Sequence, residues 1–307
     1  MRRKFTLTLV ALALLALTAC EKEPAIVHDG ERYPILFGNY ETRATAGLDD
    51  LKGDGFKVYA YLKGNTNNIH TFEKEVTYSS AQNVWGYEGL EYWIPGATYW
   101  FKAFYPTVPS AGTLTVYNTS STQPFTITDF NISEQEDIMV ATAERTVADG
   151  AKLPTNGSNV VDLNFQHLLA CVAIEVTSED DNVLVKSLSL GGIDNMGDYD
   201  GTTWSADNTT SIDINLGITL DDSPEYTDLT NGGILVIPQE VKGIELVVVA
   251  NKEYRVEIPA DKTPAWNKGT KYTYKLTIKK NNITFVDKAP YTEEWDSESA
   301  TGSVIIK

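Results

Sequence analysis

Hydrophobic and polar residues alternate in short segments along most of the chain after residue 30. Such alternation puts successive side chains on opposite faces and is typical of half-buried β-strands, as in Asp162–Phe165 and Lys186–Leu190. The runs Ile234–Ile237 and Ile244–Val249 are almost continuously apolar, which indicates strands buried on both faces. A helical period is expected only in short pieces such as Ser133–Asp137. The pattern therefore predicts an all-β protein.

Turn-forming residues separate the predicted strands. Gly64 follows the strand expected at Phe56–Leu62, and Pro106 follows the one expected at Thr98–Tyr105. The first strand of the folded body is expected at Tyr33–Tyr40. Short alternating strands between turn signals are typical of antiparallel sheets.

A polar stretch at Glu144–Asn159, which contains Gly, Pro and Asn, is the best candidate for a linker between two strand-rich halves. The length of the chain also favours two domains over one. We therefore predict two tandem antiparallel β-sandwich domains, at 44–160 and 161–307.

The start of the chain has the pattern of a secreted lipoprotein. Residues 1–19 begin with a short basic segment and continue as an apolar stretch that is too short to span a bilayer stably. Small residues before the cysteine in Leu17–Cys20 match a bacterial lipobox. We predict a signal peptide at 1–19, lipid on Cys20, and a segment at 20–43 that contains a polar tether and the first strand. An ordinary secretory signal without lipidation is the alternative.

Charge and cysteine content limit the partners and the bonds of the mature chain. The net charge is −17, and an acidic surface of this kind repels phosphate backbones, so nucleic acid is excluded as a partner. Once Cys20 carries lipid, Cys171 is the one cysteine left, so no disulfide can form within the chain. Cys171 lies in an apolar segment and is predicted to be a buried small side chain without chemistry.

Motifs for catalysis or metal binding are not recognisable. The histidines at 28, 70 and 167 are far apart in sequence and show neither zinc spacing nor a triad pattern, and His167 is predicted to be structural. The acidic segment Asp194–Gly201 does not fit an EF-hand frame and is predicted to be a turn. Glu91 and Asp129 could be proposed as a glycosidase pair, but the sequence gives no separation between them. We therefore expect that the protein is not an enzyme and that it binds neither a cofactor nor a metal ion.

A cluster of aromatic residues allows two interpretations. Its members are Trp85, Tyr87, Tyr92, Trp93, Tyr99 and Trp100. A β-sandwich without disulfides needs large side chains to fill its core, and alternating aromatic residues supply them. The alternative is a surface lipoprotein that binds glycans through exposed aromatic rings.

Several segments follow one another as they do in a known family. In chain order they are the lipobox at Cys20, Glu41–Thr45, Gly55–Tyr61, Tyr92–Gly96, Phe101–Pro106, Asp137–Ala141, Leu163–Ala170, Val236–Gln239 and Trp266–Tyr274, with a tail that contains Trp295. Their order resembles the fimbrillin family of Bacteroidetes, the subunits of type V pili and their fimbrillin-like relatives. The resemblance covers nearly the whole mature chain.

The resemblance implies a transthyretin-like fold for both sandwiches and export as a lipoprotein of the outer membrane. It implies that a trypsin-like protease cuts between Arg43 and Ala44 and thereby removes the first strand. A C-terminal segment of the next subunit would then fill the groove by donor-strand exchange. The matching positions here are 295–307, with Trp295 and the apolar residues Val304, Ile305 and Ile306. The implied partners are other fimbrial subunits, outer-membrane lipid, the protease, and host or bacterial surface receptors, with adhesion in a fimbrium as the role.

Two alternatives stay open in the sequence. Arg43 lies in a polar, Thr-rich segment that could be an ordinary accessible loop, and anchor or tip members could keep their first strand. The β-prone end Val304–Ile306 could equally be the last strand of its own domain.

Overall fold

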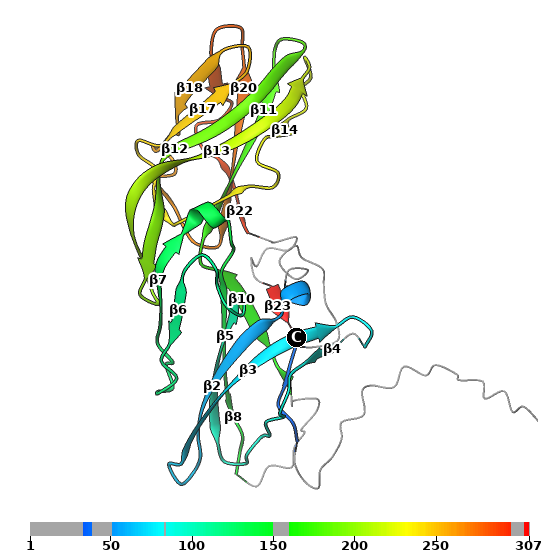
Figure 1. Cartoon of the computed structure of the whole chain (residues 1–307), viewed down its shortest axis with the longest axis vertical. Coiled ribbons are helices and arrows are strands. Elements are labelled where there is room, and N and C mark those ends of the chain that lie inside the picture. The colour runs from blue at the N-terminus through cyan, green and yellow to red at the C-terminus, as the bar shows by residue number, and fades with distance from the viewer. Residues whose placement is uncertain (1–32, 39–50, 83, 150–159, 296–303, 307) are drawn as a thin grey trace, which may run out of the picture.

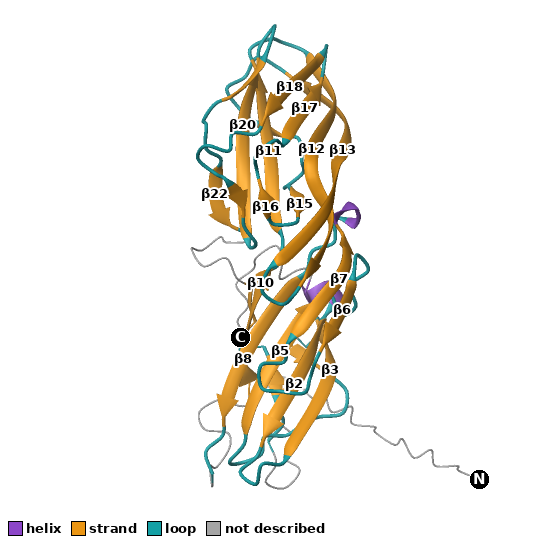
Figure 2. Cartoon of the chain, turned by 90° about the vertical axis from the view of Figure 1, so that its left-hand side faces the viewer, coloured by secondary structure: helices purple, strands orange, loops and turns teal. Residues whose placement is uncertain are grey.

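The computed structural model describes residues 33–38, 51–82, 84–149, 160–295 and 304–306. These residues form an elongated molecule of two stacked lobes built from β-strands (Figures 1 and 2). Among the described residues, helical structure is confined to short pieces, residues 51–54 and the 3₁₀ turn η1 at Ile132–Glu134. The prediction of an all-β protein with antiparallel sandwiches is confirmed. Within the described residues, no helix is both long enough and apolar enough to cross a bilayer.

The first lobe is built on a seven-stranded sheet in the order β23-β10-β8-β5-β2-β3-β4. Phe56, Val58 and Ala60 of β2 face the core, while Lys57 and Tyr59 point to the opposite face, as the alternation of the sequence predicts. The strands are β2 (Phe56–Lys63), β3 (Ile69–Ser79), β4 (Val84–Gly86), β5 (Thr98–Tyr105), β8 (Met139–Thr146), β10 (Leu163–His167) and β23 (Val304–Ile306).

The second lobe packs two sheets against each other. In one, β11 and β20 run parallel and pair over most of their length, which buries β11 almost completely. Its strands are β11 (Ala170–Ser178), β14 (Thr227–Asp228), β15 (Ile234–Val236), β20 (Thr270–Ile278), β21 (Ile283–Phe285) and β22 (Tyr291–Glu294). The other contains β12 (Val183–Tyr199), β13 (Trp204–Leu220), β17 (Glu245–Val249) and β18 (Glu253–Glu257), and a small ribbon joins β16 (Gln239–Glu240) to β19 (Ala265–Trp266).

The long strand β12 connects the two lobes. It pairs with β17 through Ser187–Gly191 and, further along, with β7 (Phe125–Asn131), which in turn pairs with β6 (Thr113–Val116). The turn predicted at Asp194–Gly201 is therefore wrong for its first part, because β12 continues through Tyr199. Asn, Gly and Asp are typical of turns, but β13 on one side and β7 on the other supply backbone partners that override this local preference.

In the described part of the chain, the buried side chains form three core clusters. The cluster of the first lobe is rich in aromatic residues, such as Phe56, Tyr99 and Phe101, whereas that of the second lobe is mostly aliphatic. A third cluster, around Phe130 and Ile237, lies where the lobes meet. The domain boundary near residue 160 stays a prediction, since β10 belongs to the sheet of the first lobe and β12 pairs with strands of both.

The predicted first strand is described only in part. Within the described residues 33–38 of the expected Tyr33–Tyr40, Leu36–Phe37 forms the strand β1 and Pro34 makes an isolated bridge to Tyr92, while residues 39 and 40 lie outside the described residues. β1 runs parallel to β9 (Val160–Val161).

Candidate functional site

One strand edge of the first lobe receives both ends of the described chain. We call residues 160–165, which comprise β9 and the start of β10, the edge run. At its beginning, Leu36 and Phe37 of β1 pair with Val160 and Val161. In the second half of the edge run, β23 pairs antiparallel with β10, with Leu163 opposite Ile306 and Phe165 opposite Val304 (Figure 1). Segments from the two ends of the chain thus occupy successive parts of one edge.

The segment that contains β1 is packed into the core of the first lobe. Ile35 is 0% and Phe37 3% exposed, and the ring of Phe37 meets that of Phe101 edge-on at 5.7 Å. The hydroxyl of Tyr87 donates a hydrogen bond to the Ile35 carbonyl (2.7 Å), and burial raises the pKa of Tyr87. Backbone bonds add to this, since the Trp93 N–H donates to the carbonyl of residue 33 (2.9 Å). Removing this segment would therefore uncover an apolar slot lined by aromatic rings.

A second contact attaches the start of the C-terminal tail. Trp295 stacks on the imidazole of His167, the last residue of β10, with ring centroids 3.8 Å apart and an interplanar angle of 18°. The Nδ1 atom of His167 lies 2.6 Å from Oδ2 of Asp137, and both side chains are largely buried. The Trp295 N–H also donates to the Gly269 carbonyl (3.1 Å). We call Asp137, His167 and Trp295 the clasp.

The predicted site residues are distributed unevenly over the structure. Cys20, Arg43 and Ala44 lie outside the described residues. Trp295 and the segment Val304–Ile306 are brought together, because both contact β10. Asp137 and the edge run were not singled out as site residues. The alternation of the sequence marks β10 as a strand but does not say which segment pairs with it.

The aromatic cluster belongs largely to the core, as its first interpretation predicts. Trp85 is 8%, Trp93 4% and Tyr99 0% exposed, and the guanidinium of Arg145 covers the Trp93 ring at 4.4 Å. Burial raises the pKa of Tyr99 to about 12. Trp100 is partly exposed but packs against Tyr61, so these rings do not form an open platform for a glycan.

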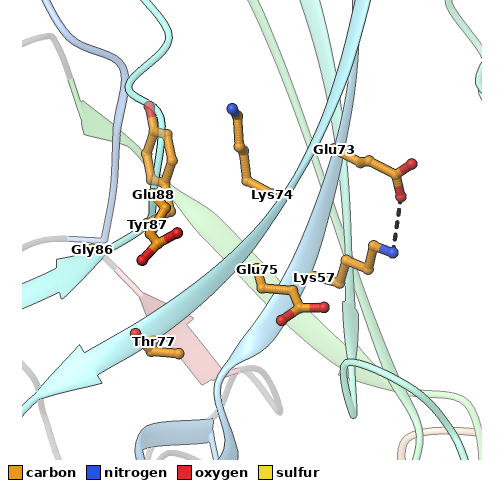
Figure 3. Close-up of a pocket in the computed structure, with 8 residues that line it drawn as sticks. All are labelled: Lys57, Glu73, Lys74, Glu75, Thr77, Gly86, Tyr87 and Glu88. Carbon is orange, nitrogen blue, oxygen red and sulfur yellow. Dashed lines mark ion pairs between the residues drawn. The ribbon is translucent and has the colours of Figure 1, made fainter.

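A surface cavity of about 760 Å³ lies beside β3 (Figure 3). Charged residues of both signs line it, and Lys57 and Glu73 form an ion pair across 2.8 Å, which raises the pKa of Lys57. Glu91 is bound to Lys74 at 3.1 Å, whereas Asp129 lies in β7 beside Asp198. Within the part of the chain that the structure describes, no group of three or more His, Cys, Asp or Glu side chains could hold a metal ion.

Fold and edge together define a two-lobed β-sandwich protein whose first lobe is completed by distant segments of its own chain. Residues 42–295 match the fimbrillin-like family, and the chain belongs to that family. The predicted family is thereby confirmed, and with it the expectation of a structural rather than an enzymatic protein. No curated protein sequence matches the chain.

The chain is similar to several solved structures, one of which has a TM-score above 0.5 and shows the same fold. A proposed cell adhesion protein from Bacteroides uniformis is similar with a TM-score of 0.53 at 18% identity, over 86% of this chain and 98% of that one. A second, from Bacteroides ovatus, is 13% identical with a TM-score of 0.48, over 87% and 99% of the two chains. The tip fimbrial protein Mfa3 from Porphyromonas gingivalis is 10% identical with a TM-score of 0.39, over 78% and 94%.

Proposed function

We propose that this chain is a structural subunit, or a pilus-associated lipoprotein, of a type V fimbria that assembles by protease-triggered donor-strand exchange and serves adhesion. The observation that carries the proposal is the shared edge run. An N-terminal segment that precedes Arg43 and an apolar C-terminal segment both pair with residues 160–165. This arrangement supports an exchange of the strand at one end of the chain for a strand from the other end.

Cleavage between Arg43 and Ala44 would separate β1 from the folded body. Val160 and Val161 would then lose their backbone partners, and the slot that Ile35 and Phe37 fill would open to water. Unpaired backbone groups beside an apolar slot are costly and favour the binding of a new strand.

The replacement strand in this proposal is the C-terminal segment Val304–Ile306 of another subunit. Main-chain hydrogen bonds to the edge run would supply affinity, and side chains that enter the slot would supply specificity. Before cleavage, lipid on Cys20 would hold the chain in the outer membrane, and afterwards the subunit would be part of the fimbrium. Adhesion to host or bacterial surfaces is the proposed role, in line with the function given to the protein from Bacteroides uniformis.

The direct test compares a chain that starts at Ala44 with one that starts at Glu21. The Ala44 chain should form ladders of polymers on a gel without boiling, whereas the Glu21 chain should stay monomeric until a trypsin-like protease is added. Arg43→Ala should block the protease-dependent step, and Arg43→Lys, which such a protease still cuts, is the matched control. Equal polymerisation of the Arg43→Ala and Arg43→Lys chains would remove cleavage from the mechanism.

A second test concerns the donor. Deleting residues 304–307 removes β23 but keeps Trp295 and the clasp. The shortened Ala44 chain should remain folded by circular dichroism and fail to polymerise. Mass spectrometry of the native protein reports lipidation, since an acylated Cys20 and a free Ala44 N-terminus have different masses.

A further inference from the structure

The C-terminal strand pairs with its own chain. β23 lies on β10, on the side away from β8, and it closes the end of the seven-stranded sheet. We propose that this contact is an autoinhibitory cap, in which the tail of each subunit occupies part of its own acceptor edge until a neighbour's tail displaces it. The inference rests on the proposed function, because it concerns the edge that donor-strand exchange would use.

The cap covers only part of the edge. β23 pairs with Leu163–Phe165, while β1 holds Val160 and Val161 directly before them. An open sheet edge is prone to pair with another chain, and a short strand along it blocks that contact. While β1 is present, the two segments together therefore leave little of the edge run for a foreign strand.

Loss of β1 changes this balance. The cap keeps its pairing with Leu163–Phe165, but an incoming tail can then pair with the whole of residues 160–165 and also fill the slot left by Phe37. Each additional backbone pair and each buried side chain favours the longer strand. Cleavage would thus tip the competition from the chain's own tail to that of a neighbour.

The clasp makes a capped state physically accessible. Trp295 is held on His167, only two residues beyond Phe165, so both described parts of the tail contact the same strand. Residues 296–303 join them and, when extended, span roughly 30 Å. Because this short segment joins the tail covalently to its own edge, the effective concentration of the tail there is in the millimolar range. A foreign tail at micromolar concentration competes poorly until it gains extra pairing.

Cysteine pairs can lock the cap. Asn164 lies opposite Ile305 in the register, and its side chain is exposed, so the double variant Asn164→Cys with Ile305→Cys should form a disulfide within one chain. Asp162→Cys with Ile305→Cys is the matched control, because Asp162 lies on the same face two residues out of register. Both variants are made in the chains that start at Glu21 and Ala44, which lack Cys20.

Under mild oxidation at low protein concentration, the in-register pair should link within monomers, seen as a loss of free thiols without dimer on a non-reducing gel. The linked Ala44 chain should not polymerise, and dithiothreitol should restore polymerisation to the rate of the unmodified Ala44 chain. Links that form only between chains, or linked monomers that polymerise at the unmodified rate, would overturn the cap.

A synthetic peptide of residues 296–307 supplies an independent measurement. Its affinity for the Ala44 chain should rise at least about tenfold when residues 304–307 of that chain are deleted, since a capped edge lowers apparent affinity by the fraction of chains that are open. Equal affinities would overturn the cap while leaving exchange intact. If the unmodified Ala44 chain never polymerises, the proposed function fails, but disulfide formation in monomers still decides the cap.

Discussion

The two lobes differ in where their strands come from. The sheets of the second lobe are closed by residues of the continuous segment 170–294, apart from the pairing of β12 with β7. The first lobe instead takes β1, β10 and β23 from widely separated parts of the chain. A strand that joins a sheet at its edge can leave without unravelling its neighbours. The strand exchange that we propose therefore concerns the first lobe and not the second.

The cores of the two lobes also differ, in whether their large side chains lie at a sheet edge or inside the sheet. In the first lobe, Phe37 completes an aromatic cluster through contacts at its own edge, including a tilted contact with Tyr87 at 5.5 Å. In the second lobe, β11 is buried between β20 on one side and the short strands β14 and β15 on the other. The slot at the edge of the first lobe can accept another large apolar side chain in place of Phe37. A strand such as β11, which has neighbours on both sides, cannot be replaced without breaking the sheet.

The largest effect should follow from removing β1. Starting the chain at Ala44 deletes the buried side chains of Ile35 and Phe37, and because each such loss costs about 2–5 kcal/mol, the opening free energy of the first lobe should fall by roughly 5 kcal/mol. Hydrogen exchange at low protein concentration would show it as faster exchange in β9 and β10 than in the Glu21 chain. Strands β11 and β20 serve as the internal reference and should keep their protection. Equal acceleration in both lobes would break the comparison.

The next largest effect on stability should follow from breaking the clasp between Asp137, His167 and Trp295. Asp137→Ala removes the carboxylate beside a buried imidazole nitrogen, and leaving a buried polar group without its partner costs about 1–3 kcal/mol. The midpoint of urea unfolding, followed by tryptophan fluorescence, should fall accordingly. Glu253→Ala is the matched control, because Glu253 pairs with Arg255 on the surface of the second lobe, where the median cost is about 0–1 kcal/mol. Equal shifts in the two variants would show that burial does not strengthen the clasp.

Particular segments show how far the sequence predicts this molecule. The strands at Phe56–Leu62 and Thr98–Tyr105 follow from local alternation, since that pattern decides which face is buried. Alternation carries no information about partners that are far away in the chain. The pairing of Val304–Ile306 with β10 and the contact of His167 with Asp137 therefore could not be predicted. The strand through Asp194–Tyr199 was missed because its stability comes from neighbours on both sides.

A smaller effect tests the interior of the second lobe. The indole N–H of Trp266 donates to the buried hydroxyl of Tyr274 (3.0 Å), so Tyr274→Phe should cost about 1–3 kcal/mol at neutral pH by leaving that donor without an acceptor. Burial raises the pKa of Tyr274 to about 12, so its contribution is complete below the ordinary tyrosine pKa near 10 and is lost as pH rises towards 12. Urea unfolding between pH 9 and 12 should therefore show a shallower decline for the variant.

Tyr99 in the first lobe supplies the counterpart, since burial also raises its pKa to about 12. Its hydroxyl accepts from the Ile94 N–H (2.7 Å) and donates to the Tyr92 carbonyl (3.2 Å). As pH rises towards 12, the protection of β5 from hydrogen exchange should fall less steeply in Tyr99→Phe than in the unmodified chain. The protection of β20 should likewise fall less steeply in Tyr274→Phe. A variant that changes the alkaline response of the opposite lobe would show that the lobes open together.

The smallest expected effect concerns the stability of the second lobe at acidic pH. Partial burial acts to raise the pKa of Asp228, but hydrogen bonds from the Thr230 hydroxyl, the Thr230 N–H and the Gly232 N–H outweigh it and hold the pKa below its ordinary value. The carboxylate therefore stabilises the fold above the ordinary pKa near 4, and this contribution is lost as pH falls through the lowered value.

Asp228→Asn should make urea unfolding less dependent on pH below about 4. Asp261→Asn, which removes one negative charge at an exposed position of the same lobe, is the matched control. The hydrogen bonds of Asp228 fix the turn after β14. Faster exchange in β14 of the Asp228→Asn variant, without faster exchange in β10, would show that the two lobes respond separately. Faster exchange in β10 as well would show that this turn is coupled to the edge run.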